Sequence, residues 1–575
     1  MLQINTGKLF TRGIGRTNRL TGVLYTNLRL PHETDIVTAA GTLRGTGSGP
    51  ADLAVIFEME ERIEAGPDGP GALISHTAGP YLDDFAVIPS FGLGGVVSRE
   101  PAIVRALTDG RPGLSSHDAP QSFIFRFFDR TLYLTDEDVA AFQSFVTTLL
   151  GLERKSFLGA IQAMRTCVAA LHRVEDNLAH AYTMMVSAVE SLAQDFDGYA
   201  PVWADIDEKK RKAVNLALKA VEDDASDRVR AAILGHEHLA LSRRYRHFIL
   251  SHIDDGFFRA PRKAGRPMAR YELEPGIRRA YNLRSAYIHQ LRALPTALSL
   301  PHEYGETTEI DRKPALTFQG LYRVTAHVIR SFVERQPAVA VEPYNYSLER
   351  AGVIEIELAP QYWAGAPIAD PRDARRRLEG LLAMVASVLT REPDAVLIDM
   401  GTALADVERL LPQSPAQYRP ALLSLHFLFN LFLVPEQRSE NFDTFYERHA
   451  EEAGQPSHET LVVATILGAV DGWPSDTYAA TLNGYFTERT RKNGVRAPRL
   501  FEAAMCLTLA EKYRAEGEIE KALQEICRAF EVHPEHQGLR ALLESAMPQQ
   551  IAWRSILLPG KSANDGNAAS AGSEL

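Results

Sequence analysis

Cysteine and long hydrophobic runs are both scarce in this sequence. Three cysteines stand among the 575 residues, and Cys167, Cys506 and Cys527 are so widely spaced that neither a disulfide framework nor a zinc site is predicted. The most apolar stretch, residues 422–434, is broken by polar residues and is shorter than the roughly 20 residues that span a bilayer. We therefore predict a buried helix there and no membrane contact.

Positive charge is in short supply as well. Lysine and arginine number 62 against 73 aspartates and glutamates, and the formal net charge is −11. A chain of this balance is not a polybasic nucleic-acid coat, so any contact with RNA or DNA must come from a local basic patch. The N-terminus has no basic segment followed by an apolar one, so we expect no signal peptide and a cytoplasmic location.

The length exceeds what one hydrophobic core supports and predicts a multidomain α+β protein. Residues 1–134 alternate short runs of β-branched and aromatic residues with turn formers, which is typical of a β-rich module. The expected strands are residues 21–28, 54–58, 85–88 and 123–128. Two glycine clusters, 45–49 and 92–95, are not followed by the helix that a phosphate-binding loop requires, so we interpret both as turns.

Residues 135–338 predict an all-helical domain. Thr135, followed by three acidic residues, has the pattern of a helix N-cap. Apolar residues recur every three or four positions from 178 to 192, as on the buried face of a helix. Further helices are expected at residues 208–222, 226–252, 275–294 and 316–335.

The C-terminal part is expected to be helical after a linker. Residues 339–372 form this linker, with one strand at 353–358, and residues 373–555 form a helical array. The stretch 506–534 has small residues and a closing proline at the offsets of a tetratricopeptide repeat. The array either presents a concave surface to a protein partner or only packs against the rest of the chain. Residues 556–575, rich in glycine, serine and asparagine, are expected to be disordered.

The stretch 277–291 places Arg284 and His289 on one expected helix that starts near Pro275. Around it, residues 241–293 contain twelve lysines and arginines against four acidic residues, a net charge of +8 within an acidic protein. Such a run is either a solvated face with a few salt bridges or a phosphate-binding patch. Because the run coincides with the helix that carries Arg284 and His289, both interpretations stay open.

With a preceding Ala-Val-Glu helix that includes Glu190, residues 174–294 resemble the HEPN superfamily of helical domains, specifically its bacterial Apea-like members. The family motif is an arginine, a few residues and a histidine, commonly with a polar residue after the arginine, the position of Ser285 here. The resemblance implies a metal-independent endoribonuclease of the antiviral-defence or toxin kind, which needs no cofactor and forms its active site in a homodimer. It implies Arg284 and His289 as catalytic residues, supported by Glu190 and Ser285.

The residue types suit this chemistry. RNA carries its own nucleophile, the 2′-hydroxyl, whose proton a histidine can take, and an arginine can hold the charged phosphate oxygens. Five residues on a helix turn by about 140° and rise by about 7.5 Å, so Arg284 and His289 of one helix do not point at one spot. This geometry agrees with the dimeric site that the resemblance implies, because two motif helices facing each other across a two-fold axis can line a shared cleft. The cations expected to hold flanking phosphates of single-stranded RNA are Arg243, Arg244, Arg246 and Lys263.

A structural interpretation competes with catalysis. Arg284 can form a buried ion pair with Glu190 while His289 is a hydrogen-bonded core histidine. The protein is then a catalytically silent scaffold that binds a protein partner through its C-terminal repeats. No metal site is expected, since His236 and His238 are too close for a helical ligand pair. A nucleotidyl-transferring protein would need a Gly-Ser with paired aspartates, an arrangement that the sequence lacks.

Overall fold

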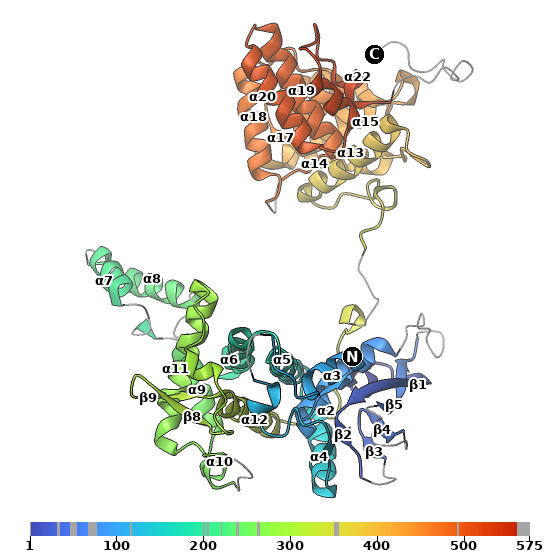
Figure 1. Ribbon diagram of the computed structural model, residues 1–575. Coiled ribbons are helices and arrows are strands. Elements are labelled where there is room, and N and C mark those ends of the chain that lie inside the picture. The colour runs from blue at the N-terminus through green and yellow to red at the C-terminus, as the bar shows by residue number, and fades with distance from the viewer. Residues whose placement is uncertain are drawn as a thin grey trace. The chain divides into compact units, whose positions relative to one another are not determined.

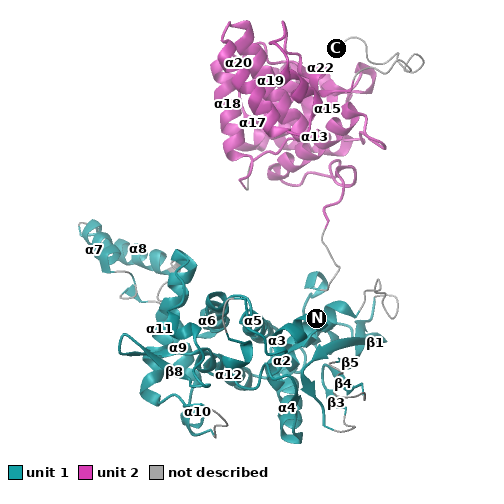
Figure 2. Cartoon of the chain, viewed as in Figure 1, with its two compact units in different colours: residues 1–355 teal, residues 356–575 magenta. Residues whose placement is uncertain are grey.

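The computed structural model divides into two compact units, residues 1–355 and 356–575 (Figure 2). The division falls inside the predicted linker 339–372. Unit 1 carries an N-terminal β-sheet followed by helices, and unit 2 is helical, so the chain is a mixed α+β protein. For residues 235 and 236 only the backbone is described. The described residues are 2–31, 35–46, 54–66, 78–114, 118–198, 202–203, 206, 208–219, 221–236, 241–260, 265–349, 356–491 and 494–559.

A five-stranded antiparallel sheet lies at the start of unit 1, in the order β3-β4-β5-β1-β6. Its long strands β1 (Ile14–Thr26) and β5 (Ala54–Glu64) pair along most of their length and confirm the predicted strands at 21–28 and 54–58. The short strands of this sheet are β3 (Ile36–Thr38), β4 (Gly41–Gly45) and β6 (Val97–Ser98). Nearby elements are α1 (Leu2–Asn5), α3 (Pro101–Thr108) and the parallel pair β2 (Leu28–Arg29) and β7 (Leu132–Tyr133).

The helix α2 (Gly79–Leu93) packs against this sheet (Figure 1). The ring of Phe85 stacks on Phe57 of β5, with 3.9 Å between the ring centroids. A Cβ atom added at Gly22 of β1 would lie 2.4 Å from a methyl carbon of Leu82, so the absence of a side chain permits this close approach.

The structure corrects two predicted strands of the N-terminal module. Residues 85–88 belong to α2, and all four are buried. An apolar run buried on every side has the same pattern in a strand and in a helix, which explains the error. Residues 123–128 follow a 3₁₀ turn at Pro120–Ser122 and form turns. Of the cluster 92–95, Gly92 and Leu93 are the last residues of α2 and only Gly94 and Gly95 form the predicted turn, with Gly94 in the left-handed conformation. Residues 47–49 of the other glycine cluster lie outside the described residues.

The remainder of unit 1 is built mainly from long helices that share one core with the sheet. At the start of the first of them, the Thr135 hydroxyl accepts a hydrogen bond from the N–H of Asp138, and the Asp138 carboxylate accepts one from the N–H of Thr135. The predicted N-cap is therefore confirmed. The predicted apolar face at 178–192 is buried in α6. These helices are α4 (Asp136–Gly151), α5 (Arg154–His172), α6 (Leu178–Phe196), α9 (Leu241–His252), α11 (Arg270–Gln290) and α12 (Phe318–Arg335).

Between α6 and α12 the chain forms more elements than predicted. The helix expected at 226–252 corresponds to α8 (Asp223–His236) and α9, and residues 237–240 between them lie outside the described residues. The chain also forms α7 (Glu208–Ala217), α10 (Asp255–Arg259) and the hairpin of β8 (Thr307–Ile310) and β9 (Lys313–Leu316). The hairpin lies where only helices were expected.

Unit 2 stacks α-helices linked by short turns around its own core. Residues 421–430 are all buried in α15, which confirms the predicted buried helix. The pair α19 and α20 forms a helical hairpin that turns at Gly517, where φ is 86°. The helices are α13 (Ala374–Thr390), α14 (Gly401–Leu410), α15 (Arg419–Phe432), α16 (Phe442–Ala453), α17 (His458–Leu467), α18 (Ser475–Glu488), α19 (Arg499–Ala515), α20 (Ile519–Val532), α21 (Gln537–Glu544) and α22 (Trp553–Leu557).

Two predicted segments fall partly outside the described residues: residues 353–355 of the expected strand and residues 560–575 of the expected tail. The tail begins later than predicted, because residues 556 and 557 belong to α22. Residues 356–358, the rest of that expected strand, are not in a strand. Within the described ranges, no helix combines the length and the apolar character needed to cross a membrane.

Candidate active site

The helix α11 carries Arg284 and His289 and begins earlier than predicted. Glu272, at its third position, accepts a hydrogen bond from the N–H of Ala269 at 2.7 Å and so caps the helix at Arg270. The predicted start near Pro275 is therefore wrong, because Pro275 lies inside the helix. A proline at this position removes one backbone donor but does not end the helix here.

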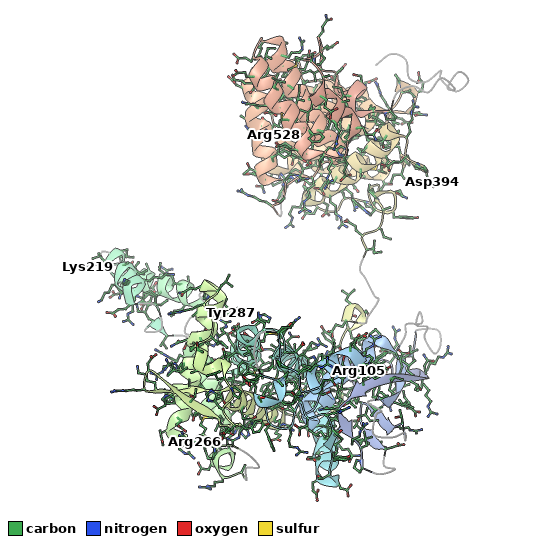
Figure 3. All side chains as sticks on the ribbon, viewed as in Figure 1. Arg105, Lys219, Arg266, Tyr287, Asp394 and Arg528 are labelled. Atoms are coloured by element: carbon green, nitrogen blue, oxygen red, sulfur yellow. The ribbon has the colours of Figure 1, made fainter. Side chains whose placement is uncertain are left out.

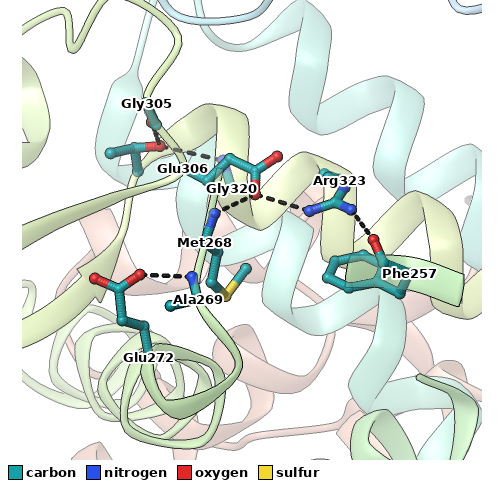
Figure 4. Close-up of polar contacts among 9 residues, drawn as sticks. Phe257, Met268, Ala269, Glu272, Gly305, Glu306, Gly320 and Arg323 are labelled. Atoms are coloured by element: carbon teal, nitrogen blue, oxygen red, sulfur yellow. Dashed lines mark hydrogen bonds and ion pairs between the residues drawn. The ribbon is translucent and has the colours of Figure 1, made fainter. Parts of the chain in front are cut away.

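The loop before α11 is tied to its neighbours through Glu306, whose side chain is 3% exposed (Figure 4). The carboxylate accepts hydrogen bonds from the N–H of Met268 and from Arg323 of α12, each at 2.8 Å. Arg323 also donates to the carbonyl of Phe257, and its guanidinium carbon lies 3.6 Å from the centroid of that ring. Gly320 permits the close packing, because a Cβ atom there would lie 1.9 Å from the Glu306 carbonyl oxygen. This network fixes the N-terminal end of α11 and the adjoining hairpin.

Arg284 extends from α11 to α6, where it forms an ion pair with Glu190. The side chain of Glu190 is 4% exposed and that of Arg284 is 18% exposed. Tyr281, almost one turn before Arg284, donates a hydrogen bond to the other carboxylate oxygen of Glu190 at 3.0 Å. The buried Nε of Arg284 has no hydrogen-bond partner among the described residues. The guanidinium is thus oriented by α6 but keeps an N–H that these residues leave unused.

Two tyrosines adjoin this ion pair. Burial and the negative charge of Glu190 raise the pKa of the Tyr281 phenol to about 12. Tyr245 of α9 packs on Tyr281, with 5.4 Å between the ring centroids, and burial also raises the pKa of its phenol. Both phenols stay protonated near neutral pH. Tyr281 donates its hydrogen bond to Glu190, whereas the buried Tyr245 hydroxyl has no hydrogen-bond partner among the described residues.

His289 is exposed in the last turn of α11 and makes no hydrogen bond or ion pair with any described residue. It is therefore not a core histidine. Helical rotation sets it about 140° away from Arg284, and Ser285 lies half-buried between them in the sequence. Within one subunit, the two predicted catalytic side chains point in different directions, and α11 does not bring them to a common point.

A groove of about 960 Å³ runs between α11, the segment that follows it and the β8–β9 hairpin. Its basic residues are Arg278, Arg279, Arg292 and Lys313. Arg279 is held by Asp311 at 2.9 Å, and Arg278 pairs with Glu274 at 2.9 Å. Arg292 and Lys313 are exposed, and their side chains have no partner among the described residues. The groove therefore offers two uncompensated cations beside two paired ones.

The rest of the groove lining is largely apolar. These residues include Pro275, Leu283, Ala286, Ala293, Pro295 and Pro314. Sequence reasoning included Arg278, Arg279 and Arg292 in the basic run at 241–293 but missed Lys313. Lys313 could have been found only by predicting the hairpin that carries it, whereas helices were expected across that region.

Of the cations predicted to hold flanking phosphates, Arg243, Arg244 and Arg246 are not among the residues that line this groove. Arg244 forms two hydrogen bonds with Asp197 at 2.7 and 2.8 Å, so its charge is neutralised at the end of α6. Arg246 donates to Glu274 at 3.2 Å. Arg243 is exposed on α9. Lys263 lies outside the described residues.

Metal ligands do not cluster in the part of the chain that the structure describes: no group of three histidines, cysteines, aspartates or glutamates could hold an ion. The side chains of His236 and His238 lie outside that part. Comparisons with protein-family models, with curated proteins and with solved structures found no match.

Proposed function

We propose that residues 174–294 form a HEPN-like domain that binds single-stranded RNA and cleaves it without a metal ion. The observation that carries this proposal is the groove along α11, where the side chains of Arg292 and Lys313 have no counter-charge among the described residues. RNA phosphates supply such charges, and the apolar lining suits unpaired bases. His289 follows Ala286 of the lining by three residues and Asn282 by seven, so it continues the same helical face. The proposed setting, bacterial defence or toxin-type regulation, follows from the family resemblance.

In the proposed reaction, His289 accepts the proton of the 2′-hydroxyl or protonates the leaving 5′-oxygen. The 2′-oxygen forms a bond to phosphorus as the bond to the 5′-oxygen breaks, which yields a 2′,3′-cyclic phosphate and a 5′-hydroxyl. Glu190 orients Arg284, whose side chain is 18% exposed, so the exposed part of the guanidinium can donate to a phosphate oxygen.

The proposal includes a homodimer, because Arg284 and His289 diverge on a single helix. Two α11 helices facing each other across a two-fold axis would bring the arginine of one subunit toward the histidine of its partner. Ile288 and Leu291, 49% and 80% exposed at the end of α11, are apolar residues that such a contact would cover.

The test is cleavage of labelled single-stranded RNA by the full-length protein in EDTA. We expect His289→Ala to lower the rate by about 10²–10⁴-fold and to leave the melting temperature unchanged, since the side chain is exposed. His247→Ala replaces another exposed histidine of unit 1, on α9, and should cleave at the wild-type rate. Equal cleavage by wild type and His289→Ala would rule out the assigned role.

The second candidate, a silent scaffold that binds a protein partner, is favoured by a different observation. Arg284, Glu190 and Tyr281 form a hydrogen-bonded network of the kind that only stabilises a core. This candidate predicts no EDTA-resistant cleavage by the wild type and a loss of stability in Arg284→Ala. The helical hairpin of α19 and α20, proposed here as a tetratricopeptide-like repeat, would then be the docking element.

A further inference from the structure

A cavity of about 330 Å³ lies in unit 2 at the start of α13. Its arginines come from distant parts of the sequence: three surround the first turn of α13 and two lie between α18 and α19. Against them stand Glu357 and Glu379, so five arginines and two glutamates leave the lining with a net charge of +3. The arginines are Arg372, Arg375, Arg376, Arg491 and Arg496.

Three of these arginines form ion pairs with surface carboxylates, and the guanidinium carbon of Arg376 also lies 5.0 Å from the centroid of the Trp363 ring. Both side chains of each pair are at least 40% exposed, and the closest contacts are 2.6, 3.1 and 3.3 Å. Water screens such pairs, and they contribute little to stability. Their guanidinium groups can therefore leave these carboxylates and bind a more highly charged anion with little loss of free energy. The pairs are Arg372 with Asp370, Arg376 with Glu357 and Arg491 with Glu488.

The other two arginines form the walls of the cavity. Arg375 donates to Glu459 at 2.5 Å, and the Glu459 side chain is 6% exposed, so this pair fastens α13 to the first turn of α17. Glu379 accepts a hydrogen bond from the backbone N–H of Arg496 at 2.7 Å, which ties the segment before α19 to α13. The cavity is held in shape by these contacts without any ligand.

We propose that this cavity binds the phosphate chain of a small polyphosphate compound. Arginine meets phosphate through two parallel N–H donors, and several arginines around one cavity suit adjacent phosphate groups. The volume falls in the range of small-ligand sites. The site lies wholly within residues 357–496 and is independent of RNA cleavage by unit 1.

The test is calorimetric titration of the full-length protein with ATP, tripolyphosphate and adenosine at physiological salt. ATP and tripolyphosphate should bind and adenosine should not. Tighter binding of ATP would identify a nucleotide, whose base Tyr418 in the lining can contact, and equal binding would identify a free polyphosphate. Arg376→Gln and Arg491→Gln should each weaken binding about tenfold.

Arg448→Gln, which replaces an exposed arginine of α16 elsewhere in unit 2, should bind as the wild type does. Absence of binding at millimolar ATP and tripolyphosphate would overturn the proposal. Unchanged affinity in both cavity variants would overturn it as well. Equal binding of poly-glutamate would show a general attraction for anions and have the same consequence. Because Arg376 and Arg491 are more than 60% exposed, their variants should fold, which circular dichroism verifies.

Discussion

Arg284 and Glu190 join α11 to α6 through an ion pair whose carboxylate is almost fully buried. A buried carboxylate is stable only with charged or hydrogen-bonding partners, and Glu190 has Arg284 on one oxygen and Tyr281 on the other. The same contact gives Arg284 a fixed orientation. Measurements of stability and of RNA cleavage can show whether this contact supports stability alone or also activity.

Removing the charge of Glu190 is expected to show how much this ion pair contributes to the free energy of unfolding. Glu190→Gln keeps a hydrogen-bonding side chain but removes its charge, so the free energy of unfolding should fall by about 1–3 kcal/mol. In a double-mutant cycle with Arg284→Met, urea denaturation should give a coupling energy of about 1–2 kcal/mol. Strictly additive losses would show that the two side chains do not stabilise each other.

Gly320→Ala is expected to disrupt the network around Glu306. The added Cβ atom would lie 1.9 Å from a backbone oxygen, so α12 and the hairpin must separate, at a cost of about 3 kcal/mol. The melting temperature of unit 1 reports this loss. Gly151→Ala at the end of α4, where the nearest atom would be 3.9 Å away, is the matched control and should change little. A Gly320→Ala protein as stable as the control would contradict the packing described here.

RNA binding in the groove is expected to depend on salt through Arg292 and Lys313. Each phosphate contact releases counterions, so replacing either residue with glutamine should reduce the slope of log K against log salt by about one. Filter binding of single-stranded RNA measures the slope. Arg105→Gln on α3, labelled in Figure 3, is an exposed control outside the groove and should leave the slope unaltered.

Unit 2 is expected to lose stability in mild acid through His426. This histidine is fully buried, stacks on Phe445 with 3.9 Å between centroids and contacts Glu408 at 3.2 Å. Burial lowers its pKa below the ordinary value, and the nearby Glu408 carboxylate only partly offsets this effect. The unfolded chain then takes up a proton at higher pH than the folded one. Stability is therefore full above about pH 6.5 and falls as the pH drops toward the folded pKa.

His426→Phe preserves the ring packing and removes the titrating group, so it should reduce the stability difference between about pH 7.5 and about pH 5.5. Urea unfolding followed by tryptophan fluorescence reports mainly on unit 2, which holds Trp363, Trp473 and Trp553 of the four tryptophans. An undiminished difference in the variant would assign the acid sensitivity to another group.

Sequence patterns within a single segment correctly predicted those helices and caps that depend only on neighbouring residues. The Thr135 cap, the buried face of α6 and the buried helix α15 all follow from spacing within one element. Prediction failed where burial on every side erased the periodicity, as in residues 85–88 of α2. It also failed at the start of α11, where Glu272 supplies the cap that Pro275 was expected to mark.

The sequence by itself determined that Arg284 and His289 stand five residues apart on one helix and so diverge, because helical rotation depends only on spacing. Only the tertiary structure decided which of the two faces the interior. The pairing of Arg284 with Glu190, 94 positions earlier, was one interpretation of the sequence that only the packing of α11 on α6 established. Lys313, which reaches the groove from a hairpin beyond α11, was not expected there. Contacts between distant segments depend on how whole elements pack, and no pattern inside either segment encodes them.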